Sequence, residues 1–382
     1  MIIGVAIIGS GIFATQEHLP AVQACPNLAL KAIYSRSLKS AKALGDKAGS
    51  VDLYSDDSGV GKTFSDLLSR KDIDAVTIAL PIPSQPEYIE AALRAGKHVL
   101  SEKPIAGDLD TAIRLIQSYE NKIHRNVIWA VGENFRFLMS FKYAAEEAAR
   151  LGRVLGFRVK MFTSVKGGSK YYGKLSKTNS TSFVISNKFA ETTWRKKPEY
   201  QGGFLLDGGV HYIAGTRRIL GSDPPASISA YTTLLQNHLP PVDTVNAIWQ
   251  TESGASGTFS VSFGTTFSGR ELHRQMSRLL LCSWLTLVLI GEYSFAFEKG
   301  TVNVVDNEVT TVVDGKSIVK DFSSAGSGVK QEVAAFAESI TKGKVNPSQS
   351  PAEALADLEI LERMLKSGEG HGKTESLKHQ MR

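Results

Sequence analysis

Cysteine is nearly absent from this 382-residue sequence, which contains only Cys25 and Cys282. Two cysteines are too few for a disulfide framework or a cysteine metal site, and such a low number is typical of proteins from a reducing compartment. The apolar segment at the start has no basic flank and runs directly into a glycine turn, which indicates a strand rather than a signal peptide. We therefore expect a cytoplasmic protein.

The sequence also lacks long apolar runs and a large excess of charge of one sign. The apolar run Leu279–Ile290 has only twelve residues, too few to span a bilayer. The 44 basic and 38 acidic residues give a net charge of +6, a modest excess that favours an anionic ligand such as a phosphorylated cofactor. Basic residues are dispersed, apart from Arg195–Lys197 and Lys378–Arg382, and no recognition helix or RNA-binding motif accompanies them. We expect neither a membrane nor nucleic acid as a partner.

What the sequence does contain is a regular alternation of strand and helix patterns up to about residue 131. This alternation predicts a doubly wound parallel sheet, and the strand patterns from residue 154 onward predict an α+β domain with a large, mostly antiparallel sheet. We place the domains at 1–138 and 139–367, with a disordered tail at 368–382. The strands expected in the first domain are Ile2–Ile8, Ala29–Ser35, Val51–Tyr54, Ala75–Leu80, His98–Ser101 and Val127–Val131.

The first expected strand is followed by a glycine motif, Gly9-Ser10-Gly11-Ile12-Phe13-Ala14. This is the G-x-G-x-x-A order, in which the first glycine allows a tight turn and the second lets a pyrophosphate approach the backbone. A helix interrupted near Pro20 is expected to follow it. The pattern predicts a dinucleotide-binding turn.

The second expected strand ends at Ser35-Arg36-Ser37, where a carboxylate would normally bind a free ribose 2′-hydroxyl. A guanidinium stands there instead, so the sequence favours NADP over NAD. The alternative is that Arg36 is an ordinary surface residue of a strand-to-helix loop.

Two further segments contain residues suited to proton transfer. Glu102-Lys103-Pro104 follows an expected strand, at the edge where open α/β sheets bind ligands. Asp207 and His211 are four residues apart, a spacing that places both on one face of a helix. A histidine near an aspartate can transfer protons near neutral pH. The alternatives are a surface role for Lys103 and a core role for His211, whereas His18, His98, His124 and His238 are expected to be structural.

In the order and spacing of its motifs the chain resembles the Gfo/Idh/MocA oxidoreductases. The resemblance spans nearly the whole chain and rests on the glycine motif, Ser35-Arg36, Ala79–Pro83, Glu102-Lys103-Pro104, Glu133–Arg136 and Gly203–His211. It implies a Rossmann domain, a C-terminal sheet domain that supplies the substrate pocket, a nicotinamide cofactor, and assembly into a homo-oligomer, a dimer or a tetramer.

The same resemblance implies roles for individual residues. His211 would be the acid/base on the reacting oxygen, Lys103 would hold that oxygen, and Asp207 would position both. Asn134 and Arg136 could reach substrate, although Arg136 could equally pair with a carboxylate, and Trp194 could contact a sugar or belong to the core. We expect no metal site. The cofactor-binding residues implied are Gly9, Ser10, Gly11, Ile12, Phe13, Ser35, Arg36, Leu80, Pro81, Glu102 and Lys103.

The sequence departs from the family pattern in two places. Many members have an acidic residue three positions after the histidine, where this chain has Ala214. The segment Glu271–Ile290 also fits poorly, and we expect it to be either a genuine insertion or an artefact of gene annotation. A chain in which this segment spoils folding, and which is inactive for that reason, is a further alternative.

The function expected is an NADP-dependent oxidoreductase that transfers a hydride between the nicotinamide and a carbon bearing a hydroxyl or carbonyl, on a sugar, polyol or diol. A non-catalytic NADP-binding sensor or regulator of the same fold is the alternative from another class. Lys103, Asp207 and His211 argue against that alternative.

Overall fold

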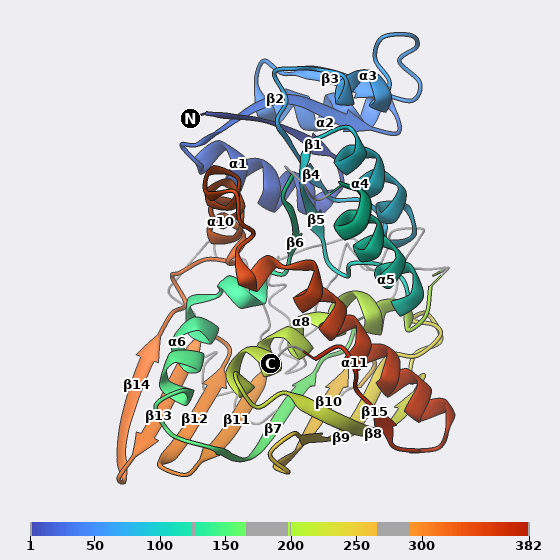
Figure 1. The fold of residues 1–382 in the computed structure, drawn as a ribbon. Helices are drawn as coiled ribbons and strands as arrows, with labels where there is room; N and C mark the ends of the chain where they lie inside the picture. Colours follow the sequence, from blue (N-terminus) through green and yellow to red (C-terminus); the bar gives the residue numbers. More distant parts are fainter. Residues whose placement is uncertain (1, 124–126, 166–197, 199, 266–290, 381–382) are drawn as a thin grey trace, which may run out of the picture. The chain divides into compact units, whose positions relative to one another are not determined.

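A computed structural model describes residues 2–123, 127–165, 198, 200–265 and 291–380 (Figure 1). The chain forms two compact units. The first comprises Met1–Phe137 with Gly328–Leu358, and the second comprises Leu138–Ser327 with Glu359–Arg382. The break after Phe137 lies beside the expected domain boundary, whereas residues 328–358 belong to the first unit although we had placed them in the second domain. Trp194 and Glu271–Ile290, singled out in the sequence, lie outside the described residues.

The first unit is built on a six-stranded sheet in the order β3-β2-β1-β4-β5-β6, and all of its strand pairs are parallel. This confirms the predicted doubly wound sheet. The order changes direction between β1 and β4, which is where such sheets bind ligands at the carboxyl ends of the strands. The strands are β1 (Ile3–Ile8), β2 (Leu28–Ser35), β3 (Asp52–Ser55), β4 (Ala75–Ile78), β5 (His98–Glu102) and β6 (Trp129–Gly132).

The helices of the first unit connect these strands and continue in the C-terminal part of the chain. Ser37 and Asp108 accept hydrogen bonds from the first turns of α2 and α5, which explains where these helices begin. The helical elements are η1 (Ala14–His18), α1 (Leu19–Ala24), α2 (Leu38–Ala48), α3 (Phe64–Leu68), η2 (Ile82–Ser84), α4 (Gln85–Arg94), α5 (Leu109–Ser118), η3 (Tyr119–Ile123), η4 (Asn134–Phe137), α10 (Val329–Lys342) and η5 (Pro347–Gln349), together with the first part of α11 (Pro351–Glu369).

The helix after the glycine motif differs from the prediction. We expected an interruption near Pro20, but the chain runs from the π-helical η1 directly into α1, with Pro20 in the first turn of α1. The first turn of a helix has backbone donors without intrahelical partners, so the missing N–H of a proline costs little there.

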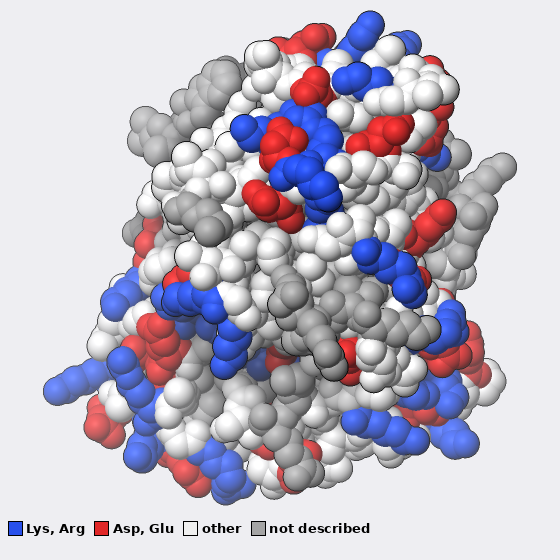
Figure 2. Space-filling model, turned by 45° about the horizontal axis from the view of Figure 1, so that its top comes forward, with Lys and Arg blue, Asp and Glu red and all other residues white. Residues whose placement is uncertain are grey.

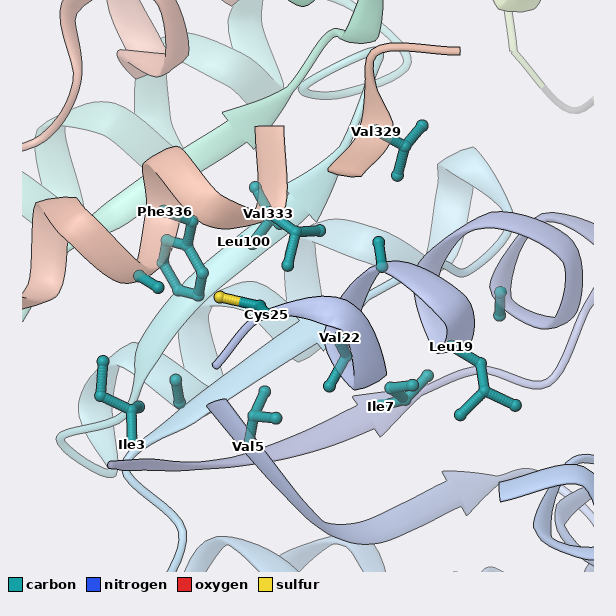
Figure 3. Packing of buried hydrophobic residues seen from close by; sticks show 14 of the residues in the cluster. Ile3, Val5, Ile7, Leu19, Val22, Cys25, Leu100, Val329, Val333 and Phe336 are labelled. Carbon is teal, nitrogen blue, oxygen red and sulfur yellow. The ribbon is translucent and has the colours of Figure 1, made fainter. Parts of the chain in front are cut away.

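The core of the first unit includes α10, which comes from a distant part of the sequence. Val333 and Phe336 are fully buried and pack in one cluster with Val5, Val22 and Cys25 (Figure 3). Their spacing along α10 is that of a helix with one apolar face. Full burial of such side chains typically contributes about 1.5–3 kcal/mol each, so α10 is an integral part of this unit.

The second unit is built on a nine-stranded sheet in the order β14-β13-β12-β11-β7-β10-β9-β8-β15. Only the β7–β10 pair is parallel, and the other pairs are antiparallel, as predicted. The unit also contains α6 (Met139–Ala148), α8 (Gly203–Leu220) and the last part of α11. The strands are β7 (Val154–Phe162), β8 (Pro225–Thr233), β9 (Thr244–Thr251), β10 (Ser256–Ser262), β11 (Glu292–Phe297), β12 (Gly300–Val305), β13 (Glu308–Val313), β14 (Lys316–Asp321) and β15 (Glu375–Ser376).

The end of the chain, expected to be disordered, is held to the second unit up to Gln380. Strand β15 pairs with β8. The buried carboxylate of Glu359 accepts hydrogen bonds from the backbone N–H groups of Lys378 (2.6 Å) and His379 (2.8 Å) and from Gln380 Nε2 (2.9 Å). The polar composition of the tail did not indicate this anchor, because the acceptor lies on α11. No helix within the described ranges is long and apolar enough to cross a membrane.

Candidate active site

The glycine motif forms a turn with open space above its backbone. Gly9 has a φ of +105°, and a Cβ there would lie 2.3 Å from the carbonyl oxygen of Ala79, so only glycine fits. A Cβ at Gly11 would meet no atom within 4 Å. The exposed backbone at Gly11 is therefore accessible to a ligand, as a pyrophosphate-binding turn requires.

The end of β2 lies next to this turn. The hydroxyl of Ser10 donates to that of the buried Ser35 over 2.8 Å, which ties the glycine motif to the β2 end. Arg36 is exposed, and its guanidinium forms no hydrogen bond or ion pair with another described residue. A free guanidinium at this position is suited to an anionic group.

The remaining predicted cofactor residues lie at the same edge of the sheet. Leu80 and Pro81 follow the end of β4, and Glu102 and Lys103 stand at the end of β5. Because all six strands are parallel, their carboxyl ends share one edge. The first unit thus brings together every residue for which we predicted a cofactor contact.

Glu102 has a partner that the sequence did not reveal. The Nε2 atom of His18 lies 2.6 Å from Glu102 Oε1, and His18 is fully buried. We had expected His18 to be a structural residue without a functional neighbour. It comes from η1, directly after the glycine motif, and the two partners are 84 positions apart in the sequence, so no local pattern indicated the contact.

Further carboxyl groups are buried around the β5 and β6 ends. Glu133 and Glu332 are each 1% exposed. Burial raises the pKa of the Glu332 carboxyl well above its usual range, and the charges of Glu102 and Glu133 raise it further. Within the described ranges, no group of three or more His, Cys, Asp or Glu side chains is arranged to hold a metal ion.

Two of the predicted substrate residues, Asn134 and Arg136, lie on the turn η4 and are buried. Arg136 is buried and forms ion pairs with Asp357 and with Glu353 Oε2 (3.4 Å), so the carboxylate pairing is what the structure shows for this residue. Asn134, on the same turn η4, is also mostly buried. The charged end of Arg136 is therefore already occupied by α11.

In the second unit Asp207 and His211 lie one turn apart on α8, as their spacing predicted. Asp207 is buried and His211 is half-buried. A Cβ at Gly203 would lie 2.1 Å from the carbonyl oxygen of Pro240, and one at Gly208 would lie 2.6 Å from the ring of Phe263. The glycines around Asp207 thus allow α8 to pack closely against neighbouring segments.

The surface has basic and acidic groups side by side. Figure 2 shows Lys and Arg side chains interspersed with Asp and Glu on the described part of the face in view. On this face the net charge of +6 is not gathered into one basic surface.

Comparison with known proteins identifies the family. A model described as "Oxidoreductase family, NAD-binding Rossmann fold" matches residues 3–129, and one for the GFO/IDH/MocA C-terminal domain matches residues 168–276. The chain is also 39% identical to dehydrogenase FPY6 of Fusarium mangiferae, over 98% of this chain and 99% of that protein. The chain belongs to the Gfo/Idh/MocA oxidoreductase family.

Other Gfo/Idh/MocA proteins extend this result. D-xylose 1-dehydrogenase (NADP(+)) 2 of Haloferax volcanii is 26% identical over 95% of this chain and 96% of that protein. The crystal structure of an oxidoreductase from Thermotoga maritima matches with a TM-score of 0.77 and 26% identity, and 98% of each chain is covered. The family and fold expected from the sequence are therefore confirmed, and dehydrogenases and reductases of sugars are among the relatives.

Proposed function

We propose that this chain is an NADP-dependent oxidoreductase that transfers a hydride between the nicotinamide and a CH–OH or C=O group of a sugar, polyol or diol. The observation that carries the proposal is the open glycine turn beside the free guanidinium of Arg36. A carboxylate at the Arg36 position would repel a 2′-phosphate, whereas a guanidinium binds one. The NADP(+)-dependent xylose dehydrogenase among the relatives supports the same cofactor and substrate class.

The residues of the first unit fit such a cofactor. The backbone around Gly11 would bind the pyrophosphate, with Arg36 on the 2′-phosphate and the Leu80-Pro81 and Glu102-Lys103 ends lining the rest of the nucleotide. When bound, the nicotinamide supplies or accepts the hydride. We infer that the second unit supplies the substrate pocket.

The proton chemistry falls to residues of this chain. We assign His211 as the acid/base for the substrate oxygen, because an imidazole side chain can both donate and accept a proton. Asp207, one helical turn before it on α8, would orient the imidazole. Lys103 would hold the reacting oxygen through its ammonium group. General acid/base catalysis of this kind typically contributes about 10²–10⁴-fold in rate.

The test is a panel of aldoses, ketoses, polyols and vicinal diols, assayed by NADPH absorbance in both directions and with both cofactors. We expect turnover of at least one compound, with NADP(H) preferred over NAD(H). Tight binding of NADPH without turnover of any compound would instead support the regulatory alternative.

A further inference from the structure

Glu332 is a buried carboxyl that the proposed reaction does not use. It lies in the first turn of α10, and its Oε1 atom has no hydrogen-bond partner among the described residues. A Cβ on Gly132 would lie 3.3 Å from Glu332 Oε2 and 3.4 Å from Glu102 Oε1, so both carboxyl groups lie against the same residue. A second carboxylate this close to a buried carboxyl group disfavours the ionised form of the buried one.

The charged groups facing Glu332 do not neutralise it. Arg136 is the one cation on a neighbouring described element that lowers its pKa, and Arg136 is already paired with Asp357 and Glu353. The packed elements α1 and η5 have no titratable residue. The other elements around Glu332 have the titratable residues Glu17 and His18 on η1, His98 and Glu102 on β5, and Arg136 on η4, and Glu133 follows β6.

The surroundings decide which carboxyl group keeps its proton. Glu102 faces His18, and an imidazole with its hydrogen on Nε2 donates to Glu102 and leaves a lone pair on the buried Nδ1, which has no partner. No donor side chain among the described residues faces Glu332 in this way, and within the same part of the chain the backbone N–H of Glu133 supports its charged form by a hydrogen bond. Glu102 therefore has a side-chain partner that Glu332 lacks among the described residues, and Glu332 is the neutral acid.

We propose that Glu332, as a neutral acid, and His18 are positioning residues that fix the Glu102–Lys103 segment for catalysis. The backbone supports this role, because Glu102 pairs with Gly132 across β5 and β6 and the N–H of Lys103 donates to the Gly132 carbonyl over 3.1 Å. The side chain of Glu102 and the backbone of Lys103 thus both contact Gly132. The kinetic part of this inference rests on the proposed function, whereas the protonation of Glu332 does not.

The first test is the melting temperature of the full chain between pH 5 and pH 8. Glu332→Gln mimics the neutral acid, and Glu338→Gln changes an exposed glutamate of the same helix as a control. A carboxyl with a raised folded-state pKa costs stability as the pH rises above its unfolded value. We expect the melting temperature of Glu332→Gln, relative to that of the wild type, to rise by about 3 °C as the pH increases from 5 to 8. The melting temperature of Glu338→Gln relative to the wild type should not change over this range. If the difference in melting temperature between Glu332→Gln and the wild type stays constant or falls as the pH rises, Glu332 is not a neutral acid.

The second test is kinetic and uses a substrate found in the panel. His18→Gln keeps a donor for Glu102, whereas His18→Leu removes it. We expect His18→Leu and Glu332→Ala to lower kcat about 10- to 100-fold through misplacement of Lys103, and His18→Gln and Glu332→Gln to recover most of it. Wild-type kcat in His18→Leu overturns the positioning role. The melting experiment needs no substrate, so it decides on Glu332 even if the proposed reaction is wrong.

Discussion

At the scale of single residues, the choice of cofactor depends on one side chain. Arg36 is exposed and forms no hydrogen bond or ion pair with another described residue, and it follows the end of β2, beside the Ser10–Ser35 hydrogen bond. Its neighbours in sequence, Ser35 and Ser37, have no charge. We therefore propose that the discrimination between NADP and NAD depends on the guanidinium of Arg36.

We predict that Arg36→Ala weakens NADPH binding about 10- to 100-fold, the loss typical for a hydrogen bond to a charged group. NADH binding should change by less than about threefold, because NADH lacks the 2′-phosphate. Fluorescence titration of both cofactors measures the ratio, with Lys47→Ala at the far end of α2 as a control. An unchanged NADPH/NADH ratio would show that the phosphate is bound elsewhere.

The sequence predicted single residues well where their function depends on neighbours in the chain. The turn at Gly9 and the helical spacing of Asp207 and His211 follow from a few consecutive residues, and the structure shows both. The contact of His18 with Glu102 joins residues 84 positions apart. No local pattern marks such a contact, so the sequence predicts only a structural role for this histidine.

At the level of secondary-structure elements, the turn between β12 and β13 contains Asp306, a carboxyl group whose pKa is raised, as that of Glu332 is. Burial raises the pKa of Asp306 to about 6. Asp306 adopts a positive φ of 52°, a conformation that asparagine also tolerates. The side chain can therefore be neutralised without a change in the turn.

We predict that Asp306→Asn stabilises the protein at pH 7–8, by about 1–3 kcal/mol, and has little effect below pH 4. The unfolded carboxyl ionises near pH 4 and the folded one near pH 6, so the wild type loses stability across this window as the pH rises. Urea unfolding at several pH values measures the difference. Asp314→Asn, in the exposed turn between β13 and β14 with a φ of 49°, is the control. Equal effects of both substitutions would refute the burial argument.

The elements themselves were predicted closely where helix caps and strand ends carry local signals. Helix α2 begins at Leu38, directly after Ser37, whose side chain caps the first turn. The structure differs from the predicted domain assignment of α10 and from the predicted disorder of the chain end for a common reason. Val333 packs against core residues that are distant in the sequence, and Glu359 accepts a hydrogen bond from the chain end. Neither composition nor periodicity indicates such contacts.

For the molecule as a whole, one exposed face of the nine-stranded sheet has apolar side chains that are suited to an interface between copies of the chain. Tyr231 on β8 is 63% exposed and Ile248 on β9 is 59% exposed. Ile248 pairs with Ser229, so Tyr231, two residues further along β8, points to the same side of the sheet. Neighbouring exposed apolar side chains of this kind are typical of interfaces.

We predict that the full chain is a homo-oligomer, a dimer or a tetramer, and that Ile248→Asp shifts it toward the monomer. A charge placed in an apolar contact would be buried without a partner, which typically costs several kcal/mol. Light scattering coupled to size-exclusion chromatography measures the mass, and Thr258→Asp on the neighbouring strand β10 tests whether the effect is specific to the apolar positions. A monomeric wild type would contradict the prediction.

We propose that this member of the Gfo/Idh/MocA family performs hydride transfer with Lys103 and His211 as its catalytic groups. The most direct test compares the wild type with Lys103→Ala and His211→Ala, by NADPH absorbance with the best compound of the panel and by NADPH fluorescence titration. We expect kcat to fall about 10²–10⁴-fold in each variant, while NADPH affinity stays within about threefold. Turnover at the wild-type rate in either variant would contradict the catalytic role of the residue that was replaced.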